Sequence, residues 1–425
     1  MRLAIITSHP IQYCAPWFRF LAGERESGES SVERGVKREG SPLSPLFSSL
    51  KVFFLWDGAG KMDRGFGVPV KWDLPLLDGY DYEFVPNMSS HPGPSRVSGL
   101  NNPSLGARIT AFRPDAVLVF GYNYLAHYRF LISGLAKGVP LLFRGDSHRL
   151  LQMRNGECGV GSGGWRELLR RRWIAAVFRR FAGFLYVGQA NHDYFRYHGV
   201  EEKRLFFAPH CVDNKRFYAE MEAAGKAAAE WRRELAIPAQ HRVVLFAGKL
   251  EPKKRPGDLL EAFRQANMPE ITLVFVGSGV LEPELRRQSN GCANIRFAPF
   301  QNQTLMPRTY MLGDLFVLPS FGSGETWGLA INEAMCMGRP VIVSDHVGCA
   351  KDLVQPGRNG LVFPAGNVPA LAAALQDALA EPPRLIAWGQ QSRKIIKDYS
   401  YEQATKGLLS ALEFVVPRRP QASAP

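Results

Sequence analysis

Residues 318–344 read LPSFGSGETWGLAINEAMCMGRPVIVS, and this stretch decides the fold. A run of apolar residues predicts a strand that ends at Pro319, and a glycine-rich loop follows it. The spacing of the next apolar residues predicts a helix over about 327–337, with Gly338 closing it and Pro340 opening the next strand. A strand, a loop, a helix and a second strand in this order are typical of a parallel sheet covered by helices.

The junction between the glycine-rich loop and the predicted helix has the features of an anion site. The N–H groups at the start of a helix have no partner within it, and the helix dipole adds positive charge there. The amides around Trp327, Gly328 and Leu329 therefore suit a diphosphate. Glu333, in the second helical turn, offers two oxygens to the two hydroxyls of a ribose. Glu325 precedes the helix, where a sugar on the far side of the diphosphate would lie.

The alternative interpretation is that Glu325 and Glu333 are solvated charges of a loop and a helix. Glu333 has small neighbours such as Ala330 and Ala334, together with apolar ones, and a fully exposed helix face would not show them. We therefore assign both carboxylates to the site, and we include Thr326, beside Glu325, among the residues that bind the ligand.

Short apolar runs followed by helical patterns recur along the whole chain. In the first half the predicted strands are residues 3–8, 51–56, 116–120, 140–144, 184–187 and 205–208. In the second half they are residues 242–247, 272–276, 294–297, 315–319, 340–344 and 360–363. The sequence therefore predicts an α/β protein of two doubly wound, Rossmann-like domains. Ligands are expected in a cleft outside the carboxyl ends of the strands.

Composition predicts where the domains begin and end. Residues 215–240 are rich in Ala, Glu and Lys and indicate a linker that contains a helix, so the first domain covers 1–214 and the second covers 241–395. Residues 23–49 mix charge, Gly, Ser and Pro without periodicity, which is typical of a mobile surface insertion. The final stretch, 396–425, holds a helical pattern that is compatible with a return to the first domain.

Composition also restricts the class of protein. The chain has 425 residues, 46% of them hydrophobic and 21% charged, which suits two globular domains. Its six cysteines, at 14, 158, 211, 292, 336 and 349, show no zinc-type spacing, so we expect no metal and no cofactor. The first residues read as a buried strand rather than a signal peptide, and no apolar run approaches the ~18 residues of a membrane span. We therefore expect a cytoplasmic protein.

The formal net charge of +13 favours an anionic partner such as a nucleotide or a phospholipid. No zinc-finger, ribonucleoprotein or helix-turn-helix pattern is visible, so we expect no nucleic-acid partner. Residues 165–181 place apolar side chains at every fourth position among arginines, namely Trp165, Leu169, Trp173, Val177 and Phe181. This basic helical pattern fits either peripheral contact with an anionic membrane or a core stripe with a solvated arginine rim, and both interpretations stay open.

Residues 318–344 resemble the donor-site motif of glycosyltransferase family 4, in which two Glu residues precede a Gly-x-Pro strand. The resemblance continues, in order and spacing, through AGKLEPKKRPGDLLEAF (247–263), VGSG (276–279), FQNQTLMPRTY (300–310) and GCAKDLVQPGRNGLVFPAGN (348–367). It implies the GT-B fold and transfer of a sugar from a nucleotide diphosphate, with retention of anomeric configuration and without a metal. The SHPIQY stretch near the start resembles a narrower branch of the family.

The resemblance also implies roles for single residues. Lys249 and Lys254 correspond to the two cations that neutralise the diphosphate and stabilise the departing nucleotide, a task that suits fixed ammonium groups. Gly248 and Gly277, in the matching loops, are expected to bind the donor. His9, within SHPIQY, is expected to contact the donor or the acceptor, while a structural hydrogen bond explains it equally well.

Asp146 follows the strand that ends in RGDSH. Many family members place there a His that contacts the donor sugar, so the resemblance implies that Asp146 replaces it. A carboxylate accepts hydrogen bonds from sugar hydroxyls, although a loop cap or a salt bridge to Arg144 is the alternative. We therefore assign Asp146 to the catalytic set together with Glu325, Lys249 and Lys254.

The sequence thus predicts a metal-independent, retaining hexosyltransferase. Its donor is a nucleotide-diphosphate sugar and its acceptor a glycan or a lipid-linked molecule, in cell-surface polysaccharide assembly. A non-catalytic nucleotide-sugar-binding protein of the same fold is one alternative, and the intact set of Glu325, Glu333, Lys249 and Lys254 counts against it. A nicotinamide-dependent oxidoreductase is another, and the first strand lacks the Gly-x-Gly-x-x-Gly turn that it requires.

Overall fold

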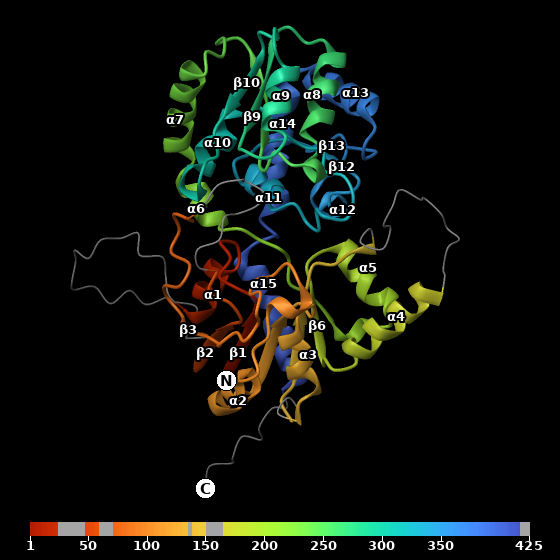
Figure 1. The fold of residues 1–425 in the computed structure, drawn as a ribbon. Coiled ribbons are helices and arrows are strands. Elements are labelled where there is room, and N and C mark those ends of the chain that lie inside the picture. Colours follow the sequence, from red (N-terminus) through yellow and green to blue (C-terminus); the bar gives the residue numbers. More distant parts are fainter. Residues whose placement is uncertain (24–46, 59–70, 135–137, 150–164, 417–425) are drawn as a thin grey trace, which may run out of the picture.

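The computed structural model describes most of the chain, namely residues 1–23, 47–58, 71–134, 138–149 and 165–416. These residues form two α/β domains, one above the other in Figure 1, and each domain has its own parallel sheet. The predicted fold class is therefore confirmed. Most of the predicted insertion, 24–46, and the end of the chain after 416 lie outside the described residues.

The first domain is built on a seven-stranded parallel sheet in the order β3-β2-β1-β4-β5-β6-β7. Its strands are β1 Arg2–Thr7, β2 Ser49–Phe54, β3 Asp81–Phe84, β4 Ala116–Phe120, β5 Leu141–Arg144, β6 Gly183–Tyr186 and β7 Leu205–Phe207. Every strand predicted in this half is present. The edge strand β3 is additional, since its four residues are partly exposed and contain no apolar run.

Helices cover both faces of the first sheet because the side chains of its strands alternate between them. On β1, Leu3 and Ile5 pack with α1 and the C-terminal helix, whereas Ala4 and Ile6 pack with α2, α3, α4 and α5. These helices are α1 Ala15–Ala22, α2 Leu105–Phe112, α3 Leu125–Ile132, α4 Trp165–Phe178 and α5 Gln189–Tyr197.

The second domain is built on a six-stranded parallel sheet in the order β10-β9-β8-β11-β12-β13. Its strands, all of them predicted, are β8 Arg242–Ala247, β9 Ile271–Val276, β10 Ile295–Ala298, β11 Leu315–Leu318, β12 Val341–Ser344 and β13 Gly360–Phe363. Its helices are α8 Pro256–Ala266, α9 Glu282–Gln288, α10 Met306–Leu312, α11 Leu329–Cys336, α12 Ala350–Leu353, α13 Val368–Leu379 and α14 Pro382–Ile396.

The segment predicted as a linker, 215–240, is largely helical and packs on the second domain. It forms α6 Asn214–Ala219 and α7 Met221–Glu234. Ala224 and Trp231 of α7 are buried in the same cluster as Val243 and Leu245 of β8. The apolar face of the linker helix thus contributes to the core of the second domain.

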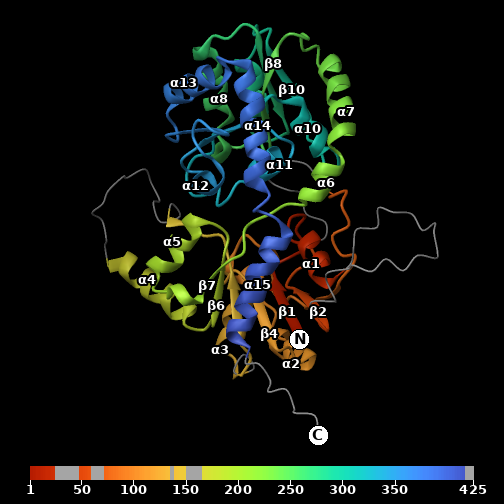
Figure 2. The same ribbon diagram turned by 180° about the vertical axis from the view of Figure 1, so that it is seen from behind.

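The last helix, α15 Tyr401–Val415, returns to the first domain and lies along its sheet, as Figures 1 and 2 show from opposite sides. Its backbone passes so close to β7 that a Cβ at Gly407 would lie 1.9 Å from the carbonyl oxygen of Phe207. Trp17 of α1 donates a hydrogen bond to the Thr405 hydroxyl at 3.1 Å. The chain therefore crosses between the domains twice.

Candidate active site

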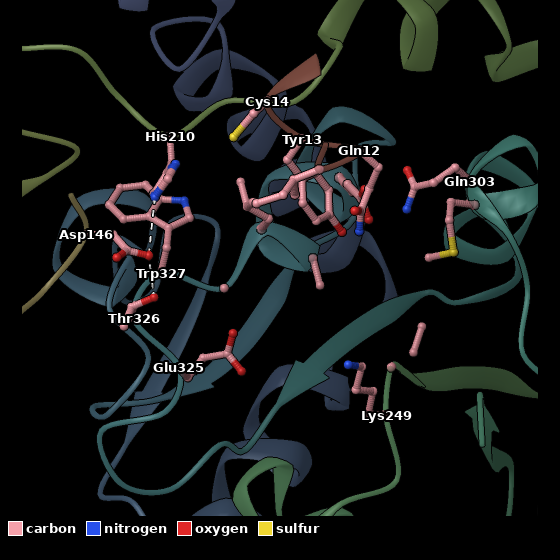
Figure 3. A pocket seen from close by; sticks show the side chains of 18 of the residues that line it. Gln12, Tyr13, Cys14, Asp146, His210, Lys249, Gln303, Glu325, Thr326 and Trp327 are labelled. Carbon is pink, nitrogen blue, oxygen red and sulfur yellow. Dashed lines mark hydrogen bonds and ion pairs between the residues drawn. The ribbon is translucent and has the colours of Figure 1, made fainter. Parts of the chain in front are cut away.

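A cavity of about 560 Å³ lies between the two domains, where the loops that follow strands of both sheets meet. The loops after β1 and β5 contribute from the first domain, and the loops after β8, β9 and β11 contribute from the second. Figure 3 shows labelled side chains of both domains around it. Every residue assigned to the site from the sequence lines this cavity: His9, Asp146, Gly248, Lys249, Lys254, Gly277, Glu325, Thr326, Trp327, Gly328, Leu329 and Glu333.

Two glycines form part of the wall that the second domain contributes. Gly277, at the end of β9, has φ +139°, and a Cβ there would lie 2.0 Å from the carbonyl oxygen of Gly248, at the end of β8. The two strand ends therefore approach too closely for any side chain. A bare backbone at this point lets a ligand approach the strand ends directly.

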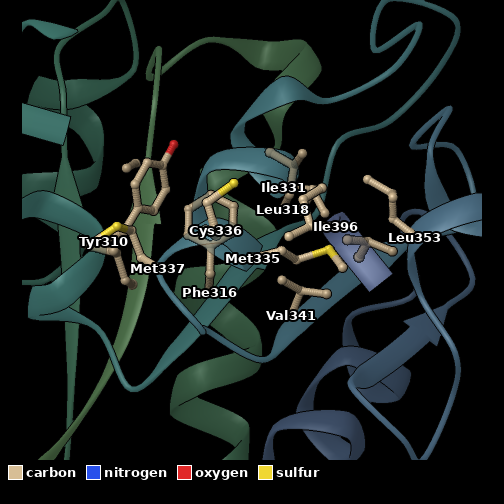
Figure 4. Packing of buried hydrophobic residues seen from close by; sticks show 14 of the residues in the cluster. Tyr310, Phe316, Leu318, Ile331, Met335, Cys336, Met337, Val341, Leu353 and Ile396 are labelled. Atoms are coloured by element: carbon tan, nitrogen blue, oxygen red, sulfur yellow. The ribbon is translucent and has the colours of Figure 1, made fainter. Parts of the chain in front are cut away.

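Helix α11 begins at Leu329, later than the predicted start at Trp327. Gly328 has φ +99°, a left-handed conformation that interrupts the helix, and the Trp327 ring is buried, with Nε1 donating to Asn332 Oδ1 at 2.8 Å. The opposite face of α11 packs into the core through Ile331 and Met335 (Figure 4). The first amides of the helix still lie at the cavity, since Leu329 and the residue after it line it.

Glu325 is held in a network of the second domain. Its Oε2 forms an ion pair with Lys254 Nζ and accepts a hydrogen bond from Ser320 Oγ at 3.0 Å. Burial on its own would raise the pKa of Glu325, yet Lys254 and Ser320 hold it below its ordinary value. The loop is fixed by Gly348, whose N–H donates to the Glu325 carbonyl at 3.1 Å and where a Cβ would lie 1.8 Å from Thr326 O. This carboxylate is therefore ionised at pH 7.

The basic loop after β8 directs its two assigned lysines into the cavity. Lys254 ends a short 3-10 turn, Pro252–Lys254, and the next residue, Arg255, has φ +51° and leads into α8. Figure 3 shows Lys249 and Glu325 at the same cavity. Arg255 instead pairs with Asp258 on α8 at 2.8 Å. An ammonium group has three donors, so Lys254 can contact Glu325 and a phosphate oxygen together.

Glu333 lies on the inner wall of the cavity and is only 2% exposed. Its Oε2 accepts a hydrogen bond from the Tyr310 hydroxyl at 2.6 Å, and its Oε1 is buried without a hydrogen-bond partner. Burial raises the pKa of Glu333 to about 7, although Tyr310 and Tyr13 favour the ionised form. An unpartnered buried oxygen is costly, and a ligand hydroxyl would satisfy it.

Asp146 connects the two domains at the cavity. Its Oδ2 accepts a hydrogen bond from the Thr326 hydroxyl at 2.7 Å and lies 3.6 Å from Nε2 of His210 (Figure 3). Burial opposes ionisation, but His210 and Thr326 lower the pKa of Asp146 to about 2. The alternative salt bridge with Arg144 does not form, because Arg144 donates to the carbonyl oxygens of Ala208 and Pro209 instead.

His9 lines the cavity from the loop after β1. Its Nδ1 lies 3.0 Å from Ser8 Oγ, and its ring lies 5.6 Å from the Trp56 ring, measured between centroids. Burial lowers the pKa of His9, so the ring is neutral at pH 7. Both expectations for His9, a structural hydrogen bond and a position beside the ligand, are compatible with this arrangement.

Several cavity residues escaped the sequence analysis. Among them are the aromatic and amide side chains Gln12, Tyr13, Gln303 and Tyr310, and also His210. Tyr310 stands on α10, 23 residues before Glu333, and His210 lies in the loop after β7. The sequence did carry signals for these residues: Gln12 and Tyr13 lie in SHPIQY, and Gln303 and Tyr310 lie in FQNQTLMPRTY. His210 follows a predicted strand, where cavity residues of parallel sheets gather.

The described residues hold no group of three or more His, Cys, Asp or Glu side chains arranged around a common metal position. Within the same residues the cysteines are free thiols, namely Cys14, Cys211, Cys292, Cys336 and Cys349.

Residues 227–395 match the family model described as Glycosyl transferases group 1. The matched stretch runs from within α7 to the end of α14 and so covers the second sheet and its helices. It contains Glu325, Glu333, Lys249 and Lys254.

Relatives of named activity align with both domains. The D-inositol 3-phosphate glycosyltransferase of Rhodococcus jostii is 28% identical over 366 residues, which cover 80% of this chain and 77% of the relative. The D-inositol 3-phosphate glycosyltransferase 2 of Catenulispora acidiphila is 29% identical over 324 residues, which cover 69% of this chain and 72% of the relative.

Solved structures share the architecture along almost the whole chain. Anabaena HepE in complex with UDP superposes with a TM-score of 0.68 at 18% identity, covering 97% of this chain and 99% of that chain. A glycosyltransferase from Rickettsia africae gives a TM-score of 0.68 at 11% identity, covering 98% and 99%. At these identities the likeness establishes the shared GT-B fold.

Proposed function

We propose that this chain, a glycosyltransferase whose second domain matches the group 1 model, is a retaining hexosyltransferase that uses a nucleotide-diphosphate sugar as donor. The observation that carries the proposal is the convergence of Lys249, Lys254 and the start of α11 on one cavity. Two ammonium groups and a helix start provide positive charge for a diphosphate, and Glu325 lies beside them.

The reaction that we propose needs no protein nucleophile. The oxygen of the acceptor hydroxyl forms a bond to the anomeric carbon on the face from which the phosphate departs, and the hydroxyl proton passes to a phosphate oxygen. Hydrogen bonds and an ion pair hold one oxygen of each nearby carboxylate, Oε2 of Glu325 and Oδ2 of Asp146, which favours a role in positioning over attack on the sugar. Lys249 and Lys254 stabilise the charge on the departing diphosphate without a metal, so turnover should persist in excess EDTA.

The acceptor is proposed to bind on the first-domain side of the cavity, near His9. A glycan or a lipid-linked acceptor, as used in cell-surface polysaccharide assembly, follows from the sequence resemblance. The relatives are named for D-inositol 3-phosphate, which adds a phosphorylated cyclitol as a second acceptor class. Transfer to inositol 3-phosphate and transfer to a lipid extract distinguish the two classes directly.

Peripheral contact with an anionic membrane, through α4, is also part of the proposal. The predicted stripe divides in the structure: Phe181 is buried just after the helix, and Val177 is partly buried against the same core. The buried residues within α4, Ile174 and Phe178, lie outside the predicted stripe. Trp165, Leu168, Leu169 and Trp173 are instead 67%, 47%, 52% and 46% exposed. A soluble surface rarely gathers such side chains in one place.

Charge favours phospholipid as the occupant of this face. Trp165, Leu168, Leu169 and Trp173 stand among exposed arginines, namely Arg166, Arg170, Arg171, Arg172 and Arg179. Lipid head groups attract such arginines, while Trp and Leu enter the acyl boundary. Among the described helices, none has the length and apolarity needed to cross a bilayer. The proposed contact is thus peripheral, on the cytoplasmic face of the cell membrane.

A screen of nucleotide sugars by thermal shift, followed by a hydrolysis and transfer assay, tests the proposed function. A donor present at ~100 times its Kd stabilises the fold by ~2.7 kcal/mol, which a shift in Tm detects. We expect one nucleotide sugar to stabilise the chain and to be consumed. Stabilisation without hydrolysis or transfer would favour the non-catalytic binding protein, and no response to any nucleotide sugar would refute the proposal.

A further inference from the structure

His210 belongs to the loop between β7 and α6. Arg144, at the end of β5, holds the backbone of that loop through hydrogen bonds. Arg144 is 4% exposed and donates to the carbonyl oxygens of Ala208 at 2.7 Å and Pro209 at 3.0 Å. Its guanidinium carbon lies 4.8 Å from the centroid of the Trp17 ring, which restricts its motion. The backbone immediately before His210 is therefore anchored to the core of the first domain.

The second domain holds His210 from the other side. Asn332 of α11 donates from Nδ2 to the carbonyl oxygen of His210 at 3.0 Å. The imidazole lies 5.8 Å from the Trp327 ring, measured between centroids and tilted by 58°. Both domains thus determine where this ring stands.

Asp146 orients the imidazole within this setting. Its Oδ2 lies 3.6 Å from Nε2 of His210 and also accepts the Thr326 hydroxyl at 2.7 Å. A carboxylate beside Nε2 favours the tautomer with its proton on that nitrogen, which leaves Nδ1 as an acceptor. Burial keeps the pKa of His210 below its ordinary value, although Asp146 acts against it, so the ring is neutral at pH 7.

The position of the pair indicates what it contacts. His210, Asp146 and Thr326 all line the cavity, and the His210 side chain is 22% exposed. Thr326 directly follows Glu325, which is assigned to the transferred sugar. Figure 3 shows the pair on the same side of the cavity as Thr326 and Trp327. The diphosphate cations, Lys249 and Lys254, come from the loop after β8 and not from this wall.

We infer that His210, oriented by Asp146, accepts a hydrogen bond from a hydroxyl of the transferred sugar and sets which sugar is used. The inference rests on the proposed function, because it places a nucleotide-diphosphate sugar in this cavity. A neutral ring held by both domains and paired with a carboxylate discriminates hydroxyl positions, since a displaced hydroxyl leaves the acceptor unpaired.

The test compares His210→Ala, His210→Asn and Asp146→Asn with the matched control His192→Ala, a histidine on α5 that pairs with Glu202 at 3.0 Å. Hydrolysis of UDP-glucose, UDP-galactose, GDP-mannose and ADP-glucose is measured, together with the Kd of UDP, GDP and ADP. We expect His210→Ala to lower kcat/KM for the preferred donor by about 10- to 100-fold and to reduce the preference between the two UDP sugars, while the nucleotide Kd changes by less than about 2-fold. His210→Asn retains an acceptor and should recover part of the loss.

Two results for His210→Ala would overturn the inference. A His210→Ala variant with the full sugar preference and kcat/KM of the control would overturn it. The inference would also be overturned if His210→Ala weakened nucleotide binding by the same factor as it lowered kcat/KM. An equal change in both quantities would indicate that His210 acts only in holding the domains together. Failure of the unmodified chain to bind or hydrolyse any of these compounds would refute the proposed function, and the inference with it.

Discussion

Glu325 and Glu333 stand on one loop-helix segment, yet their surroundings shift ionisation in opposite directions. Lys254 and Ser320 hold the pKa of Glu325 below its ordinary value in spite of burial. For Glu333, burial raises the pKa by more than the hydrogen bond from the Tyr310 hydroxyl lowers it, so the pKa rises to about 7. Near neutral pH, Glu325 is therefore ionised, while Glu333 is divided between two states. A ribose that donates hydrogen bonds would favour the ionised form of Glu333.

We predict that Glu333→Gln stabilises the ligand-free protein at pH 8 and not at pH 4.5. An unfolded Glu ionises near ~4.3, whereas Glu333 in the folded chain ionises at about 7. Between these values the folded state keeps a proton that the unfolded state loses, so stability falls as pH rises and the loss is complete above 7. Gln cannot ionise, so the variant should gain about 2–4 °C in Tm at pH 8.

Thermal unfolding at both pH values checks this prediction. Glu325→Gln is the control, because a carboxyl with a lowered pKa contributes stability above its unfolded pKa and loses it as pH falls. Glu325→Gln should thus lower Tm at pH 8. An equal change in Tm at both pH values for Glu333→Gln would show that its ionisation is not the cause.

Lys254→Ala should weaken donor binding and slow turnover together. In the proposed function the ammonium group contacts the diphosphate, and its effect grows as charge develops on the leaving group. A loss of about 10² in kcat is expected, as for removal of one fixed donor to a developing charge. Lys226→Ala is the control, since Lys226 pairs with Glu222 on the exposed face of α7. Unchanged donor kinetics in Lys254→Ala would contradict the assignment.

At the scale of elements, the buried strands were predictable and the exposed or interrupted elements were not. The strands around Glu325 are continuous apolar runs, as expected where both faces of a parallel sheet are covered. Strand β3, Asp81–Phe84, has no apolar run and forms by parallel pairing with β2 at the edge of the sheet. The start of α11 was predicted too early because Gly328 adopts φ +99°, and the helix begins only after it.

The residues of the candidate site also divide into those that the sequence predicted and those that it did not. Residues within a local motif, such as Lys254 and Glu325, were predicted because order and spacing along the chain carry them. Tyr310 lay within the quoted stretch FQNQTLMPRTY, but its contact with Glu333 was not predictable, because only the fold brings the two together. The same holds for the contact of His210 with Asp146. Pairs that form between distant loops leave no local pattern in a single sequence.

Helix α4 predicts a measurable affinity for anionic vesicles. In a flotation assay at low salt the chain should rise with phosphatidylglycerol vesicles and not with phosphatidylcholine vesicles. Binding should fade as salt shortens the Debye length to about 8 Å at 0.15 M. The double variant Trp165→Ala with Leu169→Ala should lose it.

The control for α4 is Ile386→Ala, which removes an equally exposed apolar side chain, 68% exposed, from the second domain. It should float like the unmodified chain. Equal flotation of the α4 double variant, or no binding to phosphatidylglycerol at low salt, would show that this face does not meet lipid.

At the scale of the whole molecule, the two sheets share one cavity because the chain links the domains repeatedly. Two hydrogen bonds cross the interface between the domains. The Thr326 hydroxyl donates to Asp146, and the Asn332 amide donates to the carbonyl oxygen of His210. The final helix then returns to the first sheet, so the two domains are connected by two crossings of the chain (Figures 1 and 2). Composition predicted two domains, but their contacts follow from the folded arrangement alone.

The return of α15 makes Gly407 sensitive to substitution. A Cβ there would lie 1.9 Å from Phe207 O, so Gly407→Val must push the helix from the sheet. Overpacking costs about 1–3 kcal/mol, which lowers Tm by roughly 1–3 °C in a chain of 425 residues that unfolds as one unit. Ser410→Val, on the exposed face of the same helix, is the control for the change in helix propensity. Equal Tm values for the two variants would show that α15 is not closely packed.

The stereochemistry of the first product tests the central claim most directly. Proton NMR of the transfer product, recorded before secondary transfer, reports the anomeric configuration of the newly bound sugar through its H1 coupling. Attack on the face from which the phosphate departs, with Glu325 and Asp146 held in their own hydrogen bonds, predicts the donor's configuration in the product. A product with the opposite configuration would contradict the mechanism, even if every donor-binding residue named here proved correct.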